Sequence, residues 1–453
     1  MNFMKKILFL LTIILIPINV FAKDITSSST ITINNEKYTK ITDNKENTYI
    51  NVEKDKVINI KSNEDIAGIY IIYELNSQTG IIKANNKFIE IGTKGFLHEY
   101  IDLKDIGLTK ELEITYNNNV KIGEIYILSA GELPSYVEVW EESCKEADLL
   151  LFTTHSDDEQ LFFLGLLPTY VAKGASVQVV YFTNHNDNPK RLHEQLHGLY
   201  TVGIRNYPVM GLIPDAYSET LNGAIKNIEK AGLTVEDATN FEVEMIRRFK
   251  PLVVVGHDEL GEYSHGQHIL NTHVLKIALE KANDKTYHAE SYDKYGIWDV
   301  PKTYLHLYKE NKIIMNYDEP LEYFNSKTAY EVSKEGYSKH LSQQWTWFTK
   351  WINGSNNSYT KATDIKTYSP LEYGLYRTTV GEDINKNDMF ENLIFRKDEV
   401  QEEVVENDKV INITDEGNQE YYSRYKNYII IGTIFILTVT ITLVSKKKNK
   451  VRK

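Results

Sequence analysis

The chain of 453 residues contains a single cysteine, Cys144, which excludes an internal disulfide and a metal site built from several thiolates. Core packing must therefore hold the fold, and we interpret Cys144 as a small buried side chain. Acidic residues outnumber basic ones: the chain has 63 Asp and Glu but only 51 Lys and Arg, which gives a formal charge of -12. This balance argues against a nucleic-acid partner, which requires a basic surface, and against binding of the folded body to an anionic membrane surface.

Several common signatures are missing as well. We find no internal repeat, and Gly223 and Gly232 do not form a glycine-rich phosphate loop. No order of Ser, His and Asp indicates a serine hydrolase. No cysteine follows the N-terminal apolar stretch, which argues against a lipid-modified cysteine there. The remaining signals are the apolar ends of the chain and two clusters of histidines and carboxylates.

Both ends of the chain carry apolar runs. Lys5 and Lys6 precede an apolar stretch that closes with a small residue, so residues 1–22 are predicted to be a signal peptide, with an uncleaved anchor as the alternative. Residues 427–444 are uncharged over a length that can span a membrane, and a cationic tail follows at 445–453. We therefore predict a single-pass protein of the cell membrane with an extracellular body, anchored through a C-terminal transmembrane helix; a buried core helix is the alternative.

The region between these ends changes its pattern near residue 131. Residues 23–130 alternate apolar and polar side chains in short runs, which predicts an all-β sandwich accessory domain. In residues 131–395 strand-like runs alternate with helical segments, which predicts an α/β Rossmann-like catalytic domain with a parallel sheet and crossover helices. Residues 396–426 are rich in Glu, Asp, Asn and Lys and are predicted to be an acidic stalk. The predicted fold class is thus this pair of domains followed by the transmembrane helix.

Two short clusters carry the chemistry. One is His155-Ser156-Asp157-Asp158-Glu159, and the other is His265-Gly266-Gln267-His268. Each follows a predicted strand, and ligands of α/β sheets bind at the carboxyl ends of the strands. A catalytic zinc takes three protein ligands and leaves one position to water, whose pKa falls to ~7.

These clusters supply a complete hydrolytic set. His155, Asp158 and His268 are the predicted ligands of one Zn²⁺ per chain, or of another divalent metal. Asp157 is free to act as the general base, and His265 to stabilise the oxyanion or protonate the leaving amine. Taken alone, Ser156 to Glu159 is also a plain helix capping box, and the two histidines could be ordinary surface residues. Their combination after two strands favours the metal site.

Four segments resemble the PIG-L/LmbE-like zinc de-N-acetylases over about residues 146–395. The first cluster is similar to the family's H-P-D-D-E motif. The segment 191–194, which begins with Arg191 and ends with Glu194, is similar to the family's R-x-x-E helix. Residues 256–268 are similar to the G-E-Y-G-H-x-x-H segment, and 340–343 to the late H-x-S-Q segment. The resemblance implies the same roles for the residues above and makes Arg191 the substrate-binding arginine. Ser156 replaces the family's proline and Ser264 a glycine, which puts the rate in doubt rather than the activity.

The predicted function is zinc-dependent hydrolysis of the N-acetyl group of N-acetylglucosamine-type units in an extracellular or cell-envelope glycan, with release of acetate. The predicted partners are this N-acetylated glycan and the membrane. One alternative is a non-catalytic cell-surface carbohydrate-binding or adhesion protein on a deacetylase-like scaffold. Another is a zinc amidase that acts on a non-sugar amide.

Overall fold

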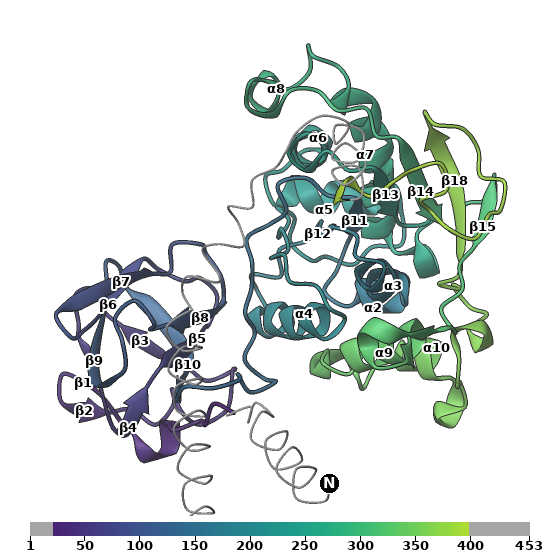
Figure 1. Cartoon of the computed structure of the whole chain (residues 1–453). Coiled ribbons are helices and arrows are strands. Elements are labelled where there is room, and N and C mark those ends of the chain that lie inside the picture. Colours follow the sequence, from purple (N-terminus) through teal and green to yellow (C-terminus); the bar gives the residue numbers. More distant parts are fainter. Residues whose placement is uncertain (1–20, 398–453) are drawn as a thin grey trace, which may run out of the picture. The chain divides into compact units, whose positions relative to one another are not determined.

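The computed structural model describes residues 21–397 (Figure 1). Most of the predicted signal peptide, nearly all of the predicted stalk and the whole predicted membrane helix lie outside these residues. The chain forms one compact unit up to Phe395, and a second unit begins at Arg396. The helices and strands labelled in Figure 1 belong to the first unit.

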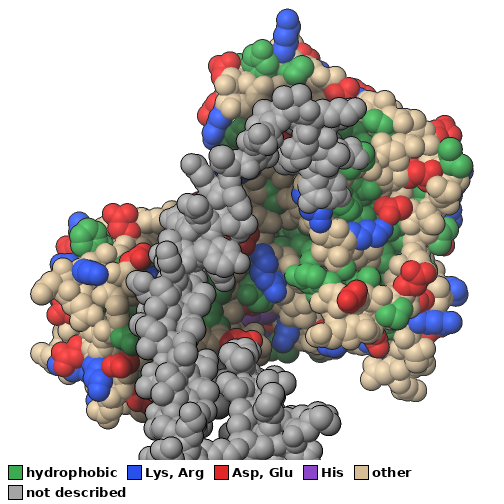
Figure 2. Space-filling model, viewed as in Figure 1, with side chains coloured by type: hydrophobic (Ala, Val, Ile, Leu, Met, Phe, Trp, Pro, Cys, Tyr) green, Lys and Arg blue, Asp and Glu red, His purple; other side chains and the backbone are tan. Residues whose placement is uncertain are grey.

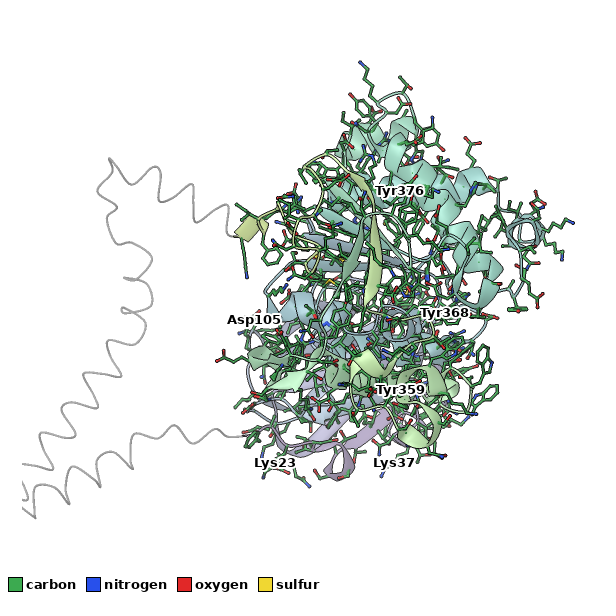
Figure 3. All side chains as sticks on the ribbon, turned by 90° about the vertical axis from the view of Figure 1, so that its right-hand side faces the viewer. Lys23, Lys37, Asp105, Tyr359, Tyr368 and Tyr376 are labelled. Atoms are coloured by element: carbon green, nitrogen blue, oxygen red, sulfur yellow. The ribbon has the colours of Figure 1, made fainter. Side chains whose placement is uncertain are left out.

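Two antiparallel sheets make up the N-terminal part of this unit. In spatial order, the strands of the larger sheet are β2 (Glu36–Lys37), β1 (Thr30–Ile33), β4 (Ile58–Ile66), β9 (Thr109–Tyr116), β6 (Gly80–Ala84) and β7 (Lys87–Ile91). Those of the smaller sheet are β3 (Ile50–Val52), β10 (Val120–Leu128), β5 (Gly68–Tyr73) and β8 (His98–Asp102). The sheets pack on each other because alternate residues of both, such as Ile60 and Ile71, belong to one hydrophobic cluster. Figure 3 shows Lys37 of β2 on this part of the ribbon.

A third, mixed sheet follows. In spatial order its strands are β12 (Val177–Tyr181), β11 (Leu149–Thr153), β13 (Val253–Gly256), β14 (Lys302–His306), β18 (Glu372–Thr378) and β15 (Lys312–Ile314). The first four strands are parallel, whereas β18 pairs antiparallel with both β14 and β15. Every residue of β11 and β12 is buried, as expected for strands that helices cover on both faces.

The prediction of an entirely parallel sheet is therefore wrong, because one side of the sheet contains antiparallel pairs. Strands β15 and β18 come from the Tyr-rich region after residue 287, where no regular hydrophobic period revealed them. Strand β18 lies between β14 and β15, which run in the same direction, and it pairs antiparallel with both; an antiparallel neighbour needs no crossover helix. Tyr376, labelled in Figure 3, lies on β18 at this antiparallel side.

The helices of the unit connect and cover the mixed sheet. They are α2 (Asp158–Leu161), α3 (Leu166–Ala172), α4 (Pro189–Thr201), α5 (Leu221–Lys230), α6 (Val235–Phe249), α7 (Gly266–Ala282), α8 (Ala289–Tyr295), α9 (Ala329–Tyr337) and α10 (Thr349–Asn353). Thr234 and Asp237 form a capping box at the start of α6. Helices α2 and α3 follow each other closely but are separate. Between them Gly165 has φ +88°, and a Cβ at Gly165 would lie only 2.3 Å from the Tyr317 ring.

No helix within residues 21–397 is long and apolar enough to cross a membrane. The predicted fold class and single-pass membrane location are corrected to this extent: residues 21–397 contain no membrane-spanning helix, and the predicted helix at 427–444 lies outside the described residues. On the face drawn in Figure 2, the Lys and Arg side chains of the described residues are scattered among Asp and Glu. This face offers no continuous basic stripe among those residues, in keeping with the excess of acidic residues in the sequence.

Candidate metal centre

The three predicted metal ligands, His155, Asp158 and His268, come together just beyond the carboxyl ends of β11 and β13. Asp158 Oδ2 lies 3.2 Å from His155 Nδ1 and 3.2 Å from His268 Nε2, and the two nitrogens are 3.1 Å apart. In a zinc tetrahedron with bonds of ~2.0–2.1 Å, the ligand atoms are roughly 3.3 Å apart. The three atoms thus have the spacing of one face of such a tetrahedron.

Hydrogen bonds behind the two imidazoles leave lone pairs on the nitrogens that face Asp158. His268 Nδ1 lies 2.8 Å from Glu262 Oε2, a carboxylate oxygen that accepts, so this nitrogen carries the ring proton. His155 Nε2 lies 3.1 Å from Gln267 Oε1, which also accepts from a backbone N–H. In neutral rings the other two nitrogens are unprotonated, and both point at a carboxylate oxygen. A proton or a metal cation between these atoms can offset the facing lone pairs, and two imidazoles with one carboxylate form a donor set that suits zinc.

Glu262, on η2 (Glu262–Ser264), contacts three buried imidazoles. Its Oε2 lies 2.8 Å from Nδ1 of both His257 and His268, and its Oε1 lies 2.6 Å from His306 Nδ1. Burial alone would raise the pKa of Glu262, but the imidazoles hold this pKa well below its usual range. The ionised carboxylate therefore fixes the tautomer and orientation of His268. The sequence analysis missed this role, although Glu262 lies within the segment 256–268 that it singled out.

Two further imidazoles, His257 and His265, lie close enough to complete alternative ligand groups with His268. Their hydrogen bonds distinguish them from the predicted ligands. His257 Nε2 accepts a backbone N–H at 3.1 Å while its Nδ1 donates to a carboxylate, so both nitrogens are engaged. His265 Nδ1 accepts a backbone N–H at 3.2 Å, which leaves the ring proton on Nε2.

His265 is therefore a neutral hydrogen-bond donor at the pocket. Burial lowers the pKa of His265 well below its usual value, and the neighbouring His155 and His268 lower it further. A protonated His265, which donation of a proton to the leaving amine would require, is thereby disfavoured. The neutral ring still offers its Nε2–H to an oxygen in the pocket.

Asp157 lies beside the ligands with a rarely adopted backbone conformation. Its φ is 138° and its ψ is −24°, which few residues other than glycine adopt. Its Oδ1 lies 3.1 Å from Arg191 Nη2. Burial raises the pKa of Asp157 to about 7; the charge of Arg191 opposes this rise, and the charge of Asp158 adds to it. The side chain is thus a carboxyl group that can exchange a proton near neutral pH.

A pair of residues behind Asp157 supports this conformation. Glu159 Oε2 accepts the backbone N–H of Asp157 at 3.0 Å, and Glu159 Oε1 lies 2.9 Å from His340 Nε2. The capping box considered for this segment is absent, because Ser156 Oγ donates instead to Gln195 Oε1 at 2.5 Å. The late H-x-S-Q segment thereby contributes His340 to the same site.

Arg191, at the start of α4, links Asp157 to Asp215. Its Nη1 donates to Asp215 Oδ2 at 2.9 Å, and its Nη2 donates to the backbone carbonyl of Ser156 at 2.8 Å. Asp215 Oδ1 also lies 3.5 Å from His155 Nε2, and Asp215 Oδ2 lies 3.5 Å from His185 Nδ1. No motif in the sequence indicated Asp215 or His185. The predicted substrate arginine thus lies beside the catalytic candidates and is held there by two carboxylates.

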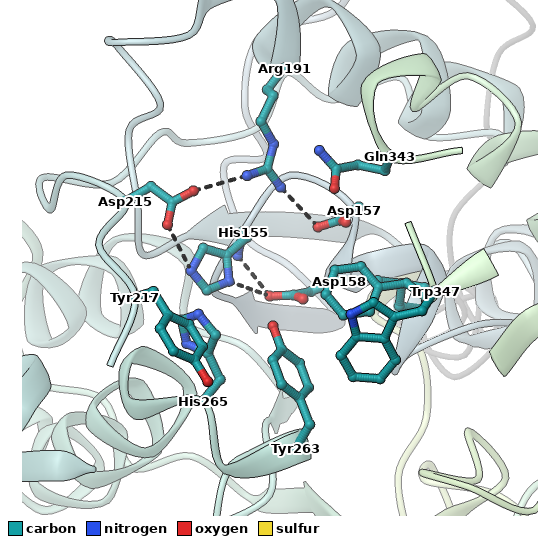
Figure 4. Close-up of a pocket in the computed structure, with 12 residues that line it drawn as sticks. His155, Asp157, Asp158, Arg191, Asp215, Tyr217, Tyr263, His265, Gln343 and Trp347 are labelled. Atoms are coloured by element: carbon teal, nitrogen blue, oxygen red, sulfur yellow. Dashed lines mark hydrogen bonds and ion pairs between the residues drawn. The ribbon is translucent and has the colours of Figure 1, made fainter. Parts of the chain in front are cut away.

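A pocket of about 350 Å³ opens over these side chains (Figure 4). Aromatic residues form part of its wall, and among them the Trp347 side chain is 54% exposed. The pocket is lined by His155, Asp157, Asp158, Leu161, Arg191, Asp215, Tyr217, Tyr263, His265, Gln343, Trp347 and Phe348. The cavity therefore combines a candidate metal centre, a carboxyl group, a neutral imidazole donor and an arginine with apolar ring surfaces.

Comparison with known proteins agrees with this arrangement. Residues 150–279 match the family model PIG-L, described as GlcNAc-PI de-N-acetylase. The chain therefore contains a PIG-L domain, which confirms the resemblance inferred from the motifs. The first cluster, Arg191 and the second cluster all fall within the matched residues.

Two curated relatives show the extent of the similarity. The chain is 30% identical over 178 residues to 1D-myo-inositol 2-acetamido-2-deoxy-alpha-D-glucopyranoside deacetylase 2 of Saccharopolyspora erythraea, which covers 34% of this chain and 63% of that protein. It is 28% identical over 179 residues to the deacetylase of Geodermatophilus obscurus that bears the same substrate name, which covers 34% of this chain and 60% of that protein. The chain thus spans less than two thirds of the length of these relatives.

Solved structures show a weaker likeness. N,N'-diacetylchitobiose deacetylase from Pyrococcus horikoshii aligns with a TM-score of 0.37 and 14% identity, covering 51% of this chain and 84% of that one. The conserved protein TT1542 from Thermus thermophilus aligns with a TM-score of 0.31 and 17% identity, covering 44% of this chain and 80% of that one. These TM-scores are too low to establish a common fold.

Proposed function

We propose that the chain is a zinc-dependent de-N-acetylase that hydrolyses the N-acetyl group of an N-acetylglucosamine-type sugar and releases acetate. The observation that carries this proposal is the triangle of His155, Asp158 and His268, whose lone pairs converge beside the free carboxyl group of Asp157. The names of the curated relatives contain a 2-acetamido-2-deoxyglucoside, which supports the choice of sugar.

His155, Asp158 and His268 would hold the ion. When bound, zinc supplies a Lewis acid for the acetyl carbonyl and lowers the pKa of water at the site to ~7. The donor atoms present fit this ion in type and spacing, and their outer hydrogen bonds keep the two ring nitrogens unprotonated.

Asp157 acts as the general base in this proposal. The water oxygen attacks the acetyl carbonyl carbon while Asp157 accepts the water proton. The C=O bond becomes a single bond, and its oxygen carries the negative charge of the tetrahedral intermediate. Arg191 keeps Asp157 oriented through the 3.1 Å contact between Nη2 and Oδ1.

His265 donates its Nε2–H to the developing oxyanion, for which a neutral imidazole is sufficient. The proton on Asp157 then passes to the sugar nitrogen as the C–N bond breaks. The oxyanion re-forms the C=O bond, so the products are the free amine and acetic acid, which ionises to acetate in water, and Asp157 returns to its ionised form. The aromatic side of the pocket provides a flat apolar surface for the sugar ring.

The test is acetate release from N-acetylglucosamine and its short oligomers, measured with the zinc-loaded chain and again after chelation. We expect release that chelation abolishes and added zinc restores. Zinc-dependent hydrolysis of simple non-sugar acetamides without release from any sugar would replace the substrate assignment with a general amidase. Tight sugar binding without hydrolysis by the zinc-loaded chain would favour a binding protein and reject the enzyme.

A further inference from the structure

A second group of histidines and carboxylates lies outside the catalytic pocket. It consists of His98 at the start of β8, Glu138 in the segment before β11, and His197 on α4. His98 Nδ1 lies 2.8 Å from Glu138 Oε2, and His197 Nδ1 lies 2.6 Å from Glu138 Oε1. His98 and Glu138 are buried, whereas His197 is partly exposed. The proposed function makes no use of this cluster.

The ring proton of His98 can be placed from its neighbours. His193 Nε2 lies 3.0 Å from the backbone carbonyl oxygen of Glu74, which only accepts, so this nitrogen donates. No carboxylate of the described residues is hydrogen-bonded to the buried His193 ring, which is therefore neutral and keeps a lone pair on Nδ1. His98 Nε2 donates to that lone pair at 2.8 Å. In a neutral His98 ring, Nδ1 then has no proton, although it faces Glu138.

His197 repeats this pattern. Its Nε2 lies 2.7 Å from Glu46 Oε1, to which it donates, so a neutral ring directs a lone pair from Nδ1 at Glu138. With both rings neutral, two lone pairs and one carboxylate would converge, and each ring donates its proton to an acceptor on its other side. The catalytic ligands His155 and His268 are held in the same way.

We propose that His98, Glu138 and His197 bind a second divalent metal ion of the zinc type. Two imidazole nitrogens and one carboxylate suit such an ion and leave a position for water. The nitrogen–oxygen separations would have to open by roughly 0.5 Å at His98 and roughly 0.7 Å at His197 to reach the spacing of a zinc tetrahedron.

Access and charge support this assignment. Glu46, Glu138 and His197 line a cavity of about 760 Å³, which provides a path for the ion and space for a water ligand. Two carboxylates at this site, Glu46 and Glu138, are balanced by one divalent cation when the imidazoles are neutral. The ion would connect a strand of the N-terminal sheets to α4, the helix that also carries Arg191, and we therefore assign it a structural role.

Metal content of the purified full chain tests the proposal independently of any activity. After saturation with zinc and dialysis, we expect about two equivalents in the natural chain by elemental analysis. His98→Gln and Glu138→Gln should each retain about one equivalent, while the control His273→Gln, at an exposed position on α7, should retain two. His268→Ala should lose the catalytic equivalent and keep the other.

The second equivalent should also raise the melting temperature of the His268→Ala variant, because metal that binds only the folded state stabilises it. One equivalent in the natural chain and none in His268→Ala would overturn the proposal and identify the cluster as proton-bound. Circular dichroism identifies variants that do not fold, and the His268→Ala result decides the question without the His98 and Glu138 substitutions.

Discussion

Asp157 combines a strained backbone with a carboxyl group that titrates near neutral pH, and both properties come from its surroundings. The strain is tolerated because Glu159 accepts its backbone N–H, while backbone N–H groups of α2 donate to its carbonyl. Burial and the adjacent Asp158 explain the raised pKa. The residue is therefore held in place by its neighbours.

We predict that Asp157→Asn lowers kcat for deacetylation by ~10²–10⁴-fold, because the amide cannot accept the water proton. The zinc content should stay at the natural level, since Asp157 is outside the predicted ligand set. Steady-state kinetics and elemental analysis check both statements, with Asp293→Asn at an exposed position as the control. Unchanged turnover in Asp157→Asn would remove this residue from the mechanism.

Glu262 supports the candidate centre through His268 without facing the ion. Glu262→Gln should weaken zinc binding by ~10–100-fold, because the amide no longer provides an ionised acceptor for the His268 ring proton. Competition with a zinc-binding dye measures the affinity. Glu290→Gln, at an exposed position on α8, should bind zinc like the natural chain. Equal affinities in the two variants would contradict the role assigned to Glu262.

At the scale of elements, α4 connects several parts of the site. Its first turn carries Arg191, and its next turn carries Glu194, which accepts from both the backbone N–H and the hydroxyl of Ser342 at 2.7 Å and 2.5 Å. Ser342 belongs to η4 (Leu341–Gln343), whose last residue, Gln343, lines the pocket. The position of this wall of the pocket therefore depends on α4.

The variant Ser342→Ala removes the hydroxyl contact and leaves the backbone contact in place. We expect KM for the acetylated sugar to rise a few-fold while kcat changes little, because the pocket wall loosens and the catalytic groups remain. Kinetics at several sugar concentrations separates the two constants, and Ser338→Ala on the same loop, whose hydroxyl donates to a local carbonyl, is the control. A large fall in kcat alone would show that η4 acts on the chemical step.

At the scale of the whole molecule, a buried carboxyl group in the N-terminal sheets should make the stability depend on pH. Burial raises the pKa of Glu124 to about 7; the neighbouring Asp43 adds to this rise, and a hydrogen bond from the Lys45 backbone opposes it. The unfolded value is ~4.3. The folded state therefore favours the protonated form, and the contribution of Glu124 to stability falls as the pH rises from about 4 through 7.

We predict that the free energy of unfolding of the natural chain, minus that of Glu124→Gln, decreases between pH 5 and pH 8. The glutamine cannot ionise and so lacks this dependence. Urea unfolding at a series of pH values provides the measurement. A difference that stays constant across this range would show that Glu124 has an ordinary pKa in the folded chain.

The sequence alone determined the type and order of the chemical groups. The candidates were singled out because two clusters of donor groups follow predicted strands, and this combination favours a metal site over a helix cap or surface histidines; they are His155, Asp157, Asp158, His265 and His268. Local patterns also predicted the alternation of strands and helices after residue 131, since hydrophobic period acts over a few residues.

Only the tertiary structure decided which distant groups meet. Asp215, Glu262 and His340 reach the site from separate segments, and the antiparallel strands β15 and β18 complete the sheet, although no local period marked them. The same holds for the pairing of His98 with Glu138 and His197. Such contacts depend on how the whole chain packs around its core. A short stretch of sequence therefore does not show which distant residues will contact it.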